Sequence, residues 1–476
     1  MLKTVMWLIA ALSLGLTPAP VSADLQTVSV QELVLRAKPA VALVTTRVDA
    51  EVTLNCGAGP VTVKPSPFQE TGTGWFIDGR GYLITNAHVV DPAHRLPPWV
   101  VHELKRNAVD QACVEPILMK QGLTRGQRPE AEDQIRRRVD MASVKLKPLP
   151  QVTVLLSNGT VLTATIQKFS PPLLLDMAGK PVADSGRDLA LLRVKDGVYP
   201  ALGLSDEEAK IGDPLRILGF PGVVLSHELL NKSAALDASV TSGTVSGLKM
   251  DAIGQDVIQT DAPAAPGNSG GPAVGHSGSV VGVLTFVSLS PSGGSIVQGF
   301  NFLIPARDIK KFLEGTEVKA GESRFNPVWA AGVSDLLNER YRSAAAKFAE
   351  ANKLLPDLVD VKRALAEAEF KVKNPPPRPF PWAWVTVALA LASGGGYGAM
   401  WYHRWQRNRF RIKASEVVRM LEEGVNPLLV DVRKASAQQT SPLKIPGAIS
   451  ITPDALARGE TGVEVDVNRA VVAYCS

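Results

Sequence analysis

The chain has 476 residues, an apolar fraction typical of a globular protein and a net charge of only +5. The length predicts two to four domains, and the small charge excludes a nucleic-acid-binding surface that covers the whole molecule. The three cysteines, Cys56, Cys113 and Cys475, are too few for a disulfide scaffold, and their spacing fits no zinc site, so we expect no bound metal.

Residues 1–23 have the three parts of a secretory signal peptide. Lys3 provides a positive charge, Met6 to Leu16 form a short apolar core, and Val21-Ser22-Ala23 resembles a cleavage site. We expect cleavage after Ala23, and the alternative is an uncleaved anchor. Both interpretations export the residues that follow.

Residues 24–313 consist mainly of short β-type runs separated by glycine-rich turns, which is typical of a β-barrel or β-sandwich. An insertion at residues 91–148 interrupts this pattern with two helix-like stretches that carry charged faces. Four roles are open for this insertion: a lid, an oligomer contact, a substrate guide, or a neutral surface feature without a function of its own. Export places Cys56 and Cys113 in an oxidising compartment, and the sequence leaves open whether they pair.

The stretch PAAPGNSGGPAV, Pro263 to Val274, surrounds Ser269 with glycine and proline. These residues hold a backbone in unusual conformations, so the stretch is either a surface loop or a nucleophile beside an oxyanion hole. A serine hydroxyl is a weak nucleophile unless a histidine takes its proton and a carboxylate orients that histidine.

The candidate base is His88, which directly follows the apolar strand of GYLITNAHVV. The candidate carboxylate is Asp188, where the apolar strand of DLALLRV begins. Asp184, four residues earlier, is the alternative, but no strand follows it directly. We interpret the remaining histidines of the exported region as surface or loop residues: His94, His102, His227 and His276.

The motifs TNAHVV, DLALLRV and DAPAAPGNSGGP resemble, in this order, the three catalytic signatures of trypsin-like serine proteases. Over residues 30–310 the chain is most similar to the bacterial HtrA/Deg type. The resemblance implies an all-β, chymotrypsin-like double barrel in which His88, Asp188 and Ser269 form a catalytic triad. It also implies an oxyanion hole made by the backbone N–H groups of Gly267 and Ser269, and chemistry that needs no cofactor.

Several positions depart from the digestive trypsins. Asn268 stands where those enzymes have the aspartate that pairs with a newly cut N-terminus, and Pro263 stands where the acid of a basic-residue pocket would be. We expect the strand VLTFV to line a pocket for small or medium apolar side chains through Leu284, Thr285 and Phe286. After Pro305 the sequence predicts helices instead of the PDZ domain that is usual in HtrA-type enzymes.

Residues 327–373 have helical periodicity and resemble a tetratricopeptide hairpin followed by one further helix. A helical spacer leading to the membrane is the alternative. The residues that carry this resemblance are Gly332, Tyr341, Ala344, Phe348, Ala351 and Pro356.

A proline-rich linker at 374–381 leads to the apolar segment 382–402, which is long enough to span a membrane. Aromatic residues bracket this segment, and an arginine-rich stretch follows it. The positive-inside rule therefore predicts that the exported region lies outside the cytoplasm and that the residues after the span lie inside it.

Residues 414–476 contain LLVDVRKAS, IPGAISI and VVAYCS, which resemble a rhodanese-like domain. The matching residues are Asp431, Arg433, Pro446, Gly447 and Cys475. In that family the cysteine carries persulfide sulfur within a cradle of backbone N–H groups. The sequence stops one residue after Cys475, and Leu443-Lys444 replaces the usual Gly-His, so we expect a truncated domain without sulfur transfer.

The sequence thus predicts a multi-domain chain: a chymotrypsin-like protease domain, an α-helical hairpin, one transmembrane helix and a partial α/β rhodanese-like domain. Its predicted function is that of a serine endopeptidase of the bacterial inner membrane that cleaves misfolded or signalling proteins, with homo-oligomers possible and no nucleic-acid partner. The alternatives are a peptide-binding holdase or scaffold, and a sulfur- or redox-signalling protein whose output is proteolysis.

Overall fold

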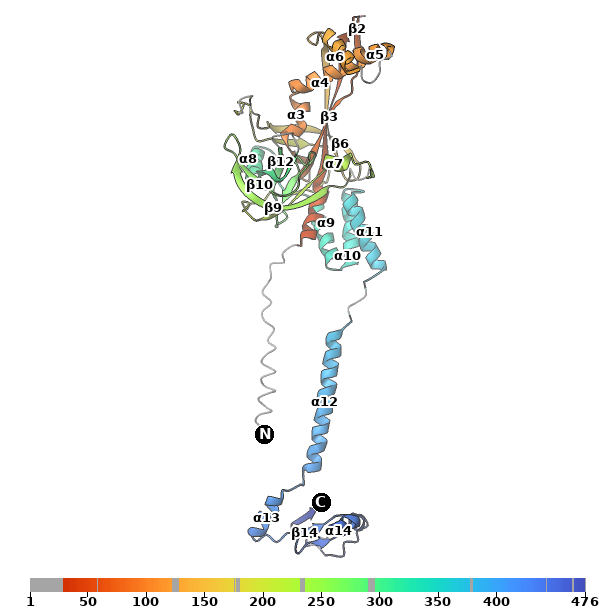
Figure 1. Cartoon of the computed structure of the whole chain (residues 1–476), viewed down its shortest axis with the longest axis vertical. Coiled ribbons are helices and arrows are strands. Elements are labelled where there is room, and N and C mark those ends of the chain that lie inside the picture. Colours follow the sequence, from red (N-terminus) through yellow and green to blue (C-terminus); the bar gives the residue numbers. More distant parts are fainter. Residues whose placement is uncertain are drawn as a thin grey trace. The chain divides into compact units, whose positions relative to one another are not determined.

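The computed structural model describes residues 29–57, 59–121, 128–174, 176, 180–231, 236–289, 296–376, 380–441, 443–464 and 466–475. The predicted signal peptide lies outside these residues. The chain divides into two compact units, residues 1–376 and 377–476 (Figure 1).

The first barrel is a six-stranded antiparallel sheet that closes on itself through a β1–β5 pairing. From Val44 to Asn55 of β1, buried residues alternate with more exposed ones, because successive side chains of a strand point to opposite faces. A short seventh strand, β2 (Pro60–Val63), pairs only with the outer end of β1. The barrel strands in sheet order are β1 (Val41–Asn55), β3 (Phe68–Asp78), β4 (Tyr82–Thr85), β7 (Leu189–Arg193), β6 (Val161–Ser170) and β5 (Lys145–Leu155).

The second barrel is also closed and six-stranded, so the predicted double barrel is confirmed. One apolar cluster includes Trp75 and Ile84 of the first barrel and Val283 and Ile304 of the second, and it joins the two. The strands in sheet order are β10 (Asp256–Thr260), β13 (Ile296–Pro305), β12 (Val280–Leu289), β11 (Pro272–Val274), β8 (Pro214–Gly219) and β9 (Ser239–Met250).

Short helices surround the barrels. The one that matters most for the site is α3 (Ala87–His94), which directly follows β4. The others are α2 (Val30–Ala37), the 3₁₀ turn η1 (Lys38–Ala40), α7 (Gly222–Leu225) and α8 (Ala306–Leu313).

The helical insertion has a hydrophobic core of its own, which it shares with the outer half of β1. Val52 and Leu54 of β1 pack there with Leu104 and Val109, so one strand of 15 residues serves two cores. In Figure 1 the insertion lies at the end of β1 away from the barrels. Its helices are α4 (Pro98–Val109), the π-helical turn η2 (Asp110–Val114), α5 (Glu115–Gln121) and α6 (Arg128–Arg138), and β5 already begins at Lys145.

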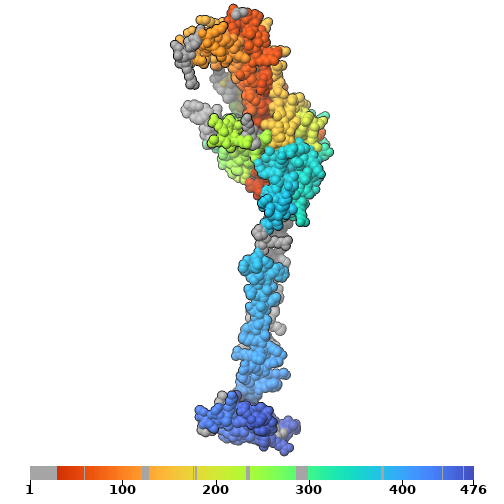
Figure 2. Space-filling view, turned by 90° about the vertical axis from the view of Figure 1, so that its right-hand side faces the viewer, coloured from red at the N-terminus to blue at the C-terminus, as the bar shows by residue number. Residues whose placement is uncertain are grey.

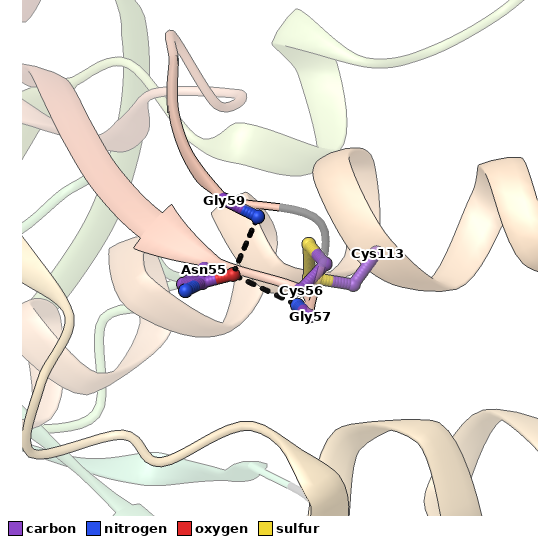
Figure 3. Close-up of a disulfide and its surroundings, with 5 residues drawn as sticks. All are labelled: Asn55, Cys56, Gly57, Gly59 and Cys113. Carbon is purple, nitrogen blue, oxygen red and sulfur yellow. Dashed lines mark hydrogen bonds between the residues drawn. A yellow bond between two sulfur atoms is a disulfide. The ribbon is translucent and has the colours of Figure 1, made fainter.

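A disulfide between Cys56 and Cys113 joins the end of β1 to η2, with the two Cα atoms 5.5 Å apart (Figure 3). The turn that follows Cys56 is held by Asn55, whose Oδ1 accepts hydrogen bonds from the N–H groups of Gly57 at 2.8 Å and Gly59 at 3.2 Å. The pairing that the sequence left open is therefore present in the structure.

The helices after the barrels pack around Trp329 and Phe348. A Cβ at Gly332 would lie 2.6 Å from the Phe348 ring, so only glycine fits there. The indole N–H of Trp329 donates to the carbonyl of Leu35 at 2.9 Å, which ties this segment to α2. Figure 2 shows the segment in cyan against the barrels. Its helices are α9 (Phe325–Leu337), α10 (Tyr341–Leu354) and α11 (Val359–Lys373), and their tetratricopeptide character stays a prediction.

In the second unit, α12 (Trp382–Asn408) is the one described helix that is long and apolar enough to cross a membrane. A three-stranded parallel sheet follows in the order β15-β14-β16, with Asp431 and Arg433 paired beside it. Cys475 is exposed and not disulfide-bonded. The elements are α13 (Ala414–Glu422), β14 (Leu428–Asp431), α14 (Ala435–Thr440), β15 (Ile449–Ser450), α15 (Pro453–Ala457) and β16 (Val471–Tyr474); the rhodanese-like assignment stays a prediction.

The disulfide gives a first testable prediction. A cross-link between cysteines 57 residues apart stabilises a fold by about 4 kcal/mol in the chain-entropy account. We expect the double variant Cys56→Ser/Cys113→Ser to lower the free energy of unfolding of the insertion by about that amount, measured by hydrogen exchange of residues 98–138 in a urea series. Cys475→Ser is the matched control. Equal protection in the double variant and the wild type would contradict the prediction.

Candidate active site

Asp188 lies at the start of β7 with a φ of +55°, a left-handed conformation that is rare and costly for a residue other than glycine. Two backbone contacts hold it there. Its N–H donates to the carbonyl of Pro171 at 2.8 Å, and its carbonyl accepts from the side-chain amide of Asn86 at 2.9 Å. Asn86 is the residue directly before α3, and its side chain bonds Asp188 and does not cap the helix.

The Asp188 carboxylate is fully engaged by His88 and one further residue. Its Oδ1 accepts from the backbone N–H of His88 at 2.9 Å, and its Oδ2 lies 2.8 Å from the ring Nδ1 of His88. The hydroxyl of Thr285 also donates to Oδ2, at 2.6 Å. The imidazole is thereby fixed at Nδ1, and its Nε2 is left for another partner.

Arg187 ties the backbone just before Asp188 to the second barrel. Its backbone N–H donates to the hydroxyl of Ser170 at 2.7 Å. Its guanidinium donates to the carbonyl of Asp256 and forms ion pairs with Asp308 and Asp251. The loop that carries Asp188 is therefore anchored to β10 and α8, across the boundary between the barrels.

Ser269 lies in the loop between β10 and β11, and this loop is fastened to the first barrel by Thr73 of β3. The N–H of Thr73 donates to the carbonyl of Ser269 at 2.8 Å, and its hydroxyl donates to the carbonyl of Gly267 at 2.7 Å. The same hydroxyl accepts from the N–H of Phe220 at 2.9 Å. One threonine thus connects β3, the serine loop and the end of β8.

The loop before Ser269 is a tight turn in which the N–H of Asn268 donates to Ala265 at 3.0 Å. Pro266 and Gly267 occupy its centre, and Gly267 has a φ of +95°, as a type II turn requires. The carbonyl of Pro266 accepts from Gly222 at 2.8 Å, and a planar peptide then points the N–H of Gly267 the opposite way. Within the described part of the chain, the N–H groups of Gly267 and Ser269 donate to no backbone carbonyl.

The Ser269 hydroxyl lies 3.5 Å from the carbonyl of Thr285, a long contact. Because the hydroxyl of that threonine binds Asp188, Thr285 connects Ser269 with the His88–Asp188 pair. The pairing of β12 with β13 shifts register between Leu284 and Phe286, which leaves Thr285 at a bulge. Bulges re-aim side chains, and this one turns Thr285 toward Asp188.

Two of the three predicted pocket residues have described side chains, and both side chains are used by other parts of the protein. Leu284 belongs to the core of the second barrel and is buried, and the Thr285 hydroxyl is used by Asp188. The side chain of Phe286 lies outside the described residues. The substrate pocket itself therefore stays a prediction.

The alternative carboxylate, Asp184, pairs with Arg95 at 2.6 Å on the surface and has no contact with His88. Asn268 is buried, and its Oδ1 has no hydrogen-bond partner among the described residues. A carboxylate in its place would be a buried charge without a cation, so asparagine suits this position better than aspartate.

Acidic groups dominate the surroundings of His88. Burial lowers the pKa of His88, but the charge of Asp188 and its hydrogen bond, together with the charges of Glu70 and Asp91, raise it overall above its ordinary value. The imidazolium form is therefore stabilised at this position.

Three residues of this arrangement were not singled out by the sequence: Thr73, Asn86 and Arg187. Thr285 was predicted as a pocket residue, and its contact with Asp188 was not predicted. Each lies within two residues of a motif or inside an apolar strand, and a polar side chain in an apolar strand was the available signal for Thr285. The sequence gives no comparable signal for Thr73, because the partners of its side chain lie more than 140 residues away.

The surroundings of His88 give a second prediction. In the full chain in detergent micelles, the His88 ring should titrate above the ordinary histidine pKa, measured by ¹³C NMR with labelled histidine. Asp188→Asn should lower this midpoint, because it removes the nearest negative charge. Asp184→Asn is the matched control and should leave the midpoint in place. A midpoint unaffected by Asp188→Asn would contradict the prediction.

Residues 72–283 match the family described as the trypsin-like peptidase domain. A probable periplasmic serine endoprotease DegP-like of Brucella suis is 35% identical over 170 residues, which are 34% of this chain and 27% of the relative. The serine endoprotease DegS of Haemophilus influenzae is 29% identical over 161 residues, 33% of this chain and 39% of that relative. The chain thus spans only about a quarter to two fifths of the length of these relatives.

Two solved structures are also similar. The HtrA-type protease AlgWS227A with tripeptide is 24% identical, with a TM-score of 0.33, over 60% of this chain and 62% of that chain. The serine endoprotease from Yersinia pestis is 20% identical, with a TM-score of 0.31, over 60% of this chain and 64% of that chain. These scores are low, and the fold assignment rests on the two closed barrels.

Proposed function

Because this chain carries a trypsin-like serine peptidase domain related to HtrA/DegP endoproteases, we propose that it is a membrane-anchored serine endopeptidase that uses His88, Asp188 and Ser269 as its catalytic triad. The observation that supports this most is the engagement of Asp188 by both the backbone and the ring of His88, with Thr285 linking the pair to Ser269.

In the first step Ser269 Oγ attacks the scissile carbonyl while His88 Nε2 takes its proton. The hydroxyl must first give up its long contact with Thr285, by rotation about the Cα–Cβ bond. Asp188 holds Nδ1, so the ring accepts the proton at Nε2, and the carboxylate stabilises the imidazolium that forms. His88 then passes the proton to the leaving amine, and a water molecule hydrolyses the acyl-enzyme by the same steps in reverse.

The oxygen of the tetrahedral intermediate is bound by the N–H groups of Gly267 and Ser269. The contact between Pro266 and Gly222 supports this role, because it sets the direction of the Gly267 N–H before substrate arrives. One such preorganised donor contributes about 3–4 kcal/mol to transition-state stabilisation.

The proposed location is the extracytoplasmic side of the bacterial inner membrane, with α12 as the anchor. The disulfide between Cys56 and Cys113 supports an oxidising compartment. The proposed substrates are misfolded or signalling proteins of the envelope.

The third prediction tests the triad. We expect the full chain in detergent micelles to form one fluorophosphonate adduct, located on Ser269 by peptide mass, and to degrade unfolded casein. Ser269→Ala and His88→Ala should lose both properties, because the adduct needs an activated hydroxyl. His276→Ala, at an exposed loop position, is the control for loss of a histidine. Casein binding without adduct or cleavage in the wild type would favour a holdase instead.

The fourth prediction tests the oxyanion hole. A Cβ at residue 267 would lie 2.4 Å from the carbonyl oxygen of Phe220, so Gly267→Ala must displace the turn. We expect kcat/KM to fall by about 10²–10³-fold, as for the loss of one oxyanion donor. The matched control is Gly254→Ala, which has a similar positive φ but no atom within 4 Å of the added Cβ. Equal losses in both variants would show that backbone strain, not the site, is responsible.

A further inference from the structure

Glu70 lies on β3 and faces the helix that carries His88. Its direct partner across the β1–β3 ladder is Thr46, whose hydroxyl donates to the carbonyl of Val89 at 2.6 Å. Residues opposite each other on two strands point to the same face of the sheet, so Glu70 shares the α3 face with Thr46.

Gly72 is independent evidence that Glu70 points to the face of the sheet covered by α3. It lies two residues after Glu70, so its missing side chain would point to the same face. A Cβ there would lie 2.5 Å from a methyl group of Val89 and 3.1 Å from the carbonyl oxygen of Ser269. The face on which Glu70 lies is therefore the face that meets both α3 and the serine loop.

Glu70 differs from the other acids around His88 because it has no partner. Asp188 is bound by His88 and Thr285, and Asp91 pairs with Arg95 at 2.5 Å. Within the described part of the chain, the Glu70 carboxylate has neither a hydrogen bond nor an ion pair, although it is only partly exposed. Burial raises the pKa of Glu70, and the nearby His88 acts in the opposite direction. A half-buried carboxylate of this kind is stabilised by a cation.

The position of β3 shows which part of a substrate would supply that cation. The serine loop lies between two strands: Leu284 of β12 accepts from Gly270 on one side, and Thr73 of β3 donates to Ser269 on the other. The predicted pocket, which would bind the substrate side chain on the acyl side of the scissile bond, is formed by residues of β12. Glu70, on β3 and beside the helix of His88, lies on the other side, where the leaving amine receives its proton from His88.

We propose that Glu70 forms a substrate subsite that binds a lysine or arginine side chain within the first two residues on the leaving-group side of the scissile bond. The proposal rests on the proposed function, since it assigns substrate selection to the same site. A charge-assisted contact with a half-buried carboxylate is strong enough to select a side chain.

The test is a set of fluorogenic peptides that differ only at the first or second residue after the scissile bond, with lysine, norleucine or glutamate there. Norleucine matches the length of the lysine stem without its charge. The full chain in detergent micelles is compared with Glu70→Gln and Glu70→Lys. Glu51→Gln, on the outer half of β1 and paired with Lys64 and Lys147, is the matched control.

We expect the wild type and Glu51→Gln to cleave the lysine peptide with a kcat/KM about tenfold above the norleucine peptide. Glu70→Gln should lose this ratio, and Glu70→Lys should prefer glutamate. A purely structural role of Glu70 would lower all rates without changing these ratios.

The pH profile gives a second readout. The acidic groups around His88 are Glu70, Asp91 and Asp188, so Glu70→Gln should shift the acid limb of kcat/KM on the norleucine peptide to lower pH.

Fluorophosphonate labelling separates two kinds of failure. An adduct on Ser269 with equal rates for lysine and norleucine, or with a lysine preference that survives in Glu70→Gln, overturns the Glu70 subsite alone. The absence of any adduct overturns the proposed peptidase and the subsite with it.

Discussion

The site depends on the docking of the serine loop of the second barrel onto strand β3 of the first. Thr73 makes this contact with its N–H and its hydroxyl, and the same hydroxyl accepts from Phe220. Because the serine loop is a turn without regular structure, its own hydrogen bonds do not define its position. The position of the loop is set instead by β3, a neighbouring strand whose backbone is fixed in a closed barrel. The two barrels must therefore be packed together before the positions of Ser269 and the Gly267 amide are set.

Asp188 is likewise held by contacts from both barrels. Its left-handed backbone is held within the first barrel by Pro171 and Asn86, and its carboxylate is approached from the second barrel by Thr285. Arg187 adds a further connection, with its guanidinium on β10 and α8. The strain at Asp188 is of the order of 1–3 kcal/mol, and it persists because contacts from both sides exclude relaxation. Movement between the barrels would thus disturb the acid and the serine loop together.

The sequence predicted the parts of this site that are local. His88 and Asp188 each follow or precede an apolar strand, and Ser269 lies in a turn whose composition requires unusual backbone conformations. The contacts between these parts depend on strand register, which pairs residues far apart in the chain. The bulge at Thr285 and the anchor of Arg187 on Asp308 are of this kind. The insertion shows the same limit. The alternation of β1 continues without a break from Val44 to Asn55, so it does not reveal where the barrel ends and the second core begins.

The charges around His88 connect substrate selection with proton transfer. Three carboxylates favour the imidazolium form of His88. In the proposed mechanism this would stabilise the transition state, but it would oppose the neutral form of His88 that accepts the proton of Ser269. In the proposed mechanism Asp188 must remain charged, and Asp91 is already paired with Arg95. In the proposed subsite, Glu70 is the member of this group whose charge a substrate would neutralise. A basic side chain bound there would lower the pKa of His88 in the complex, so the substrate that fits the subsite would also convert the histidine into the form that begins the reaction.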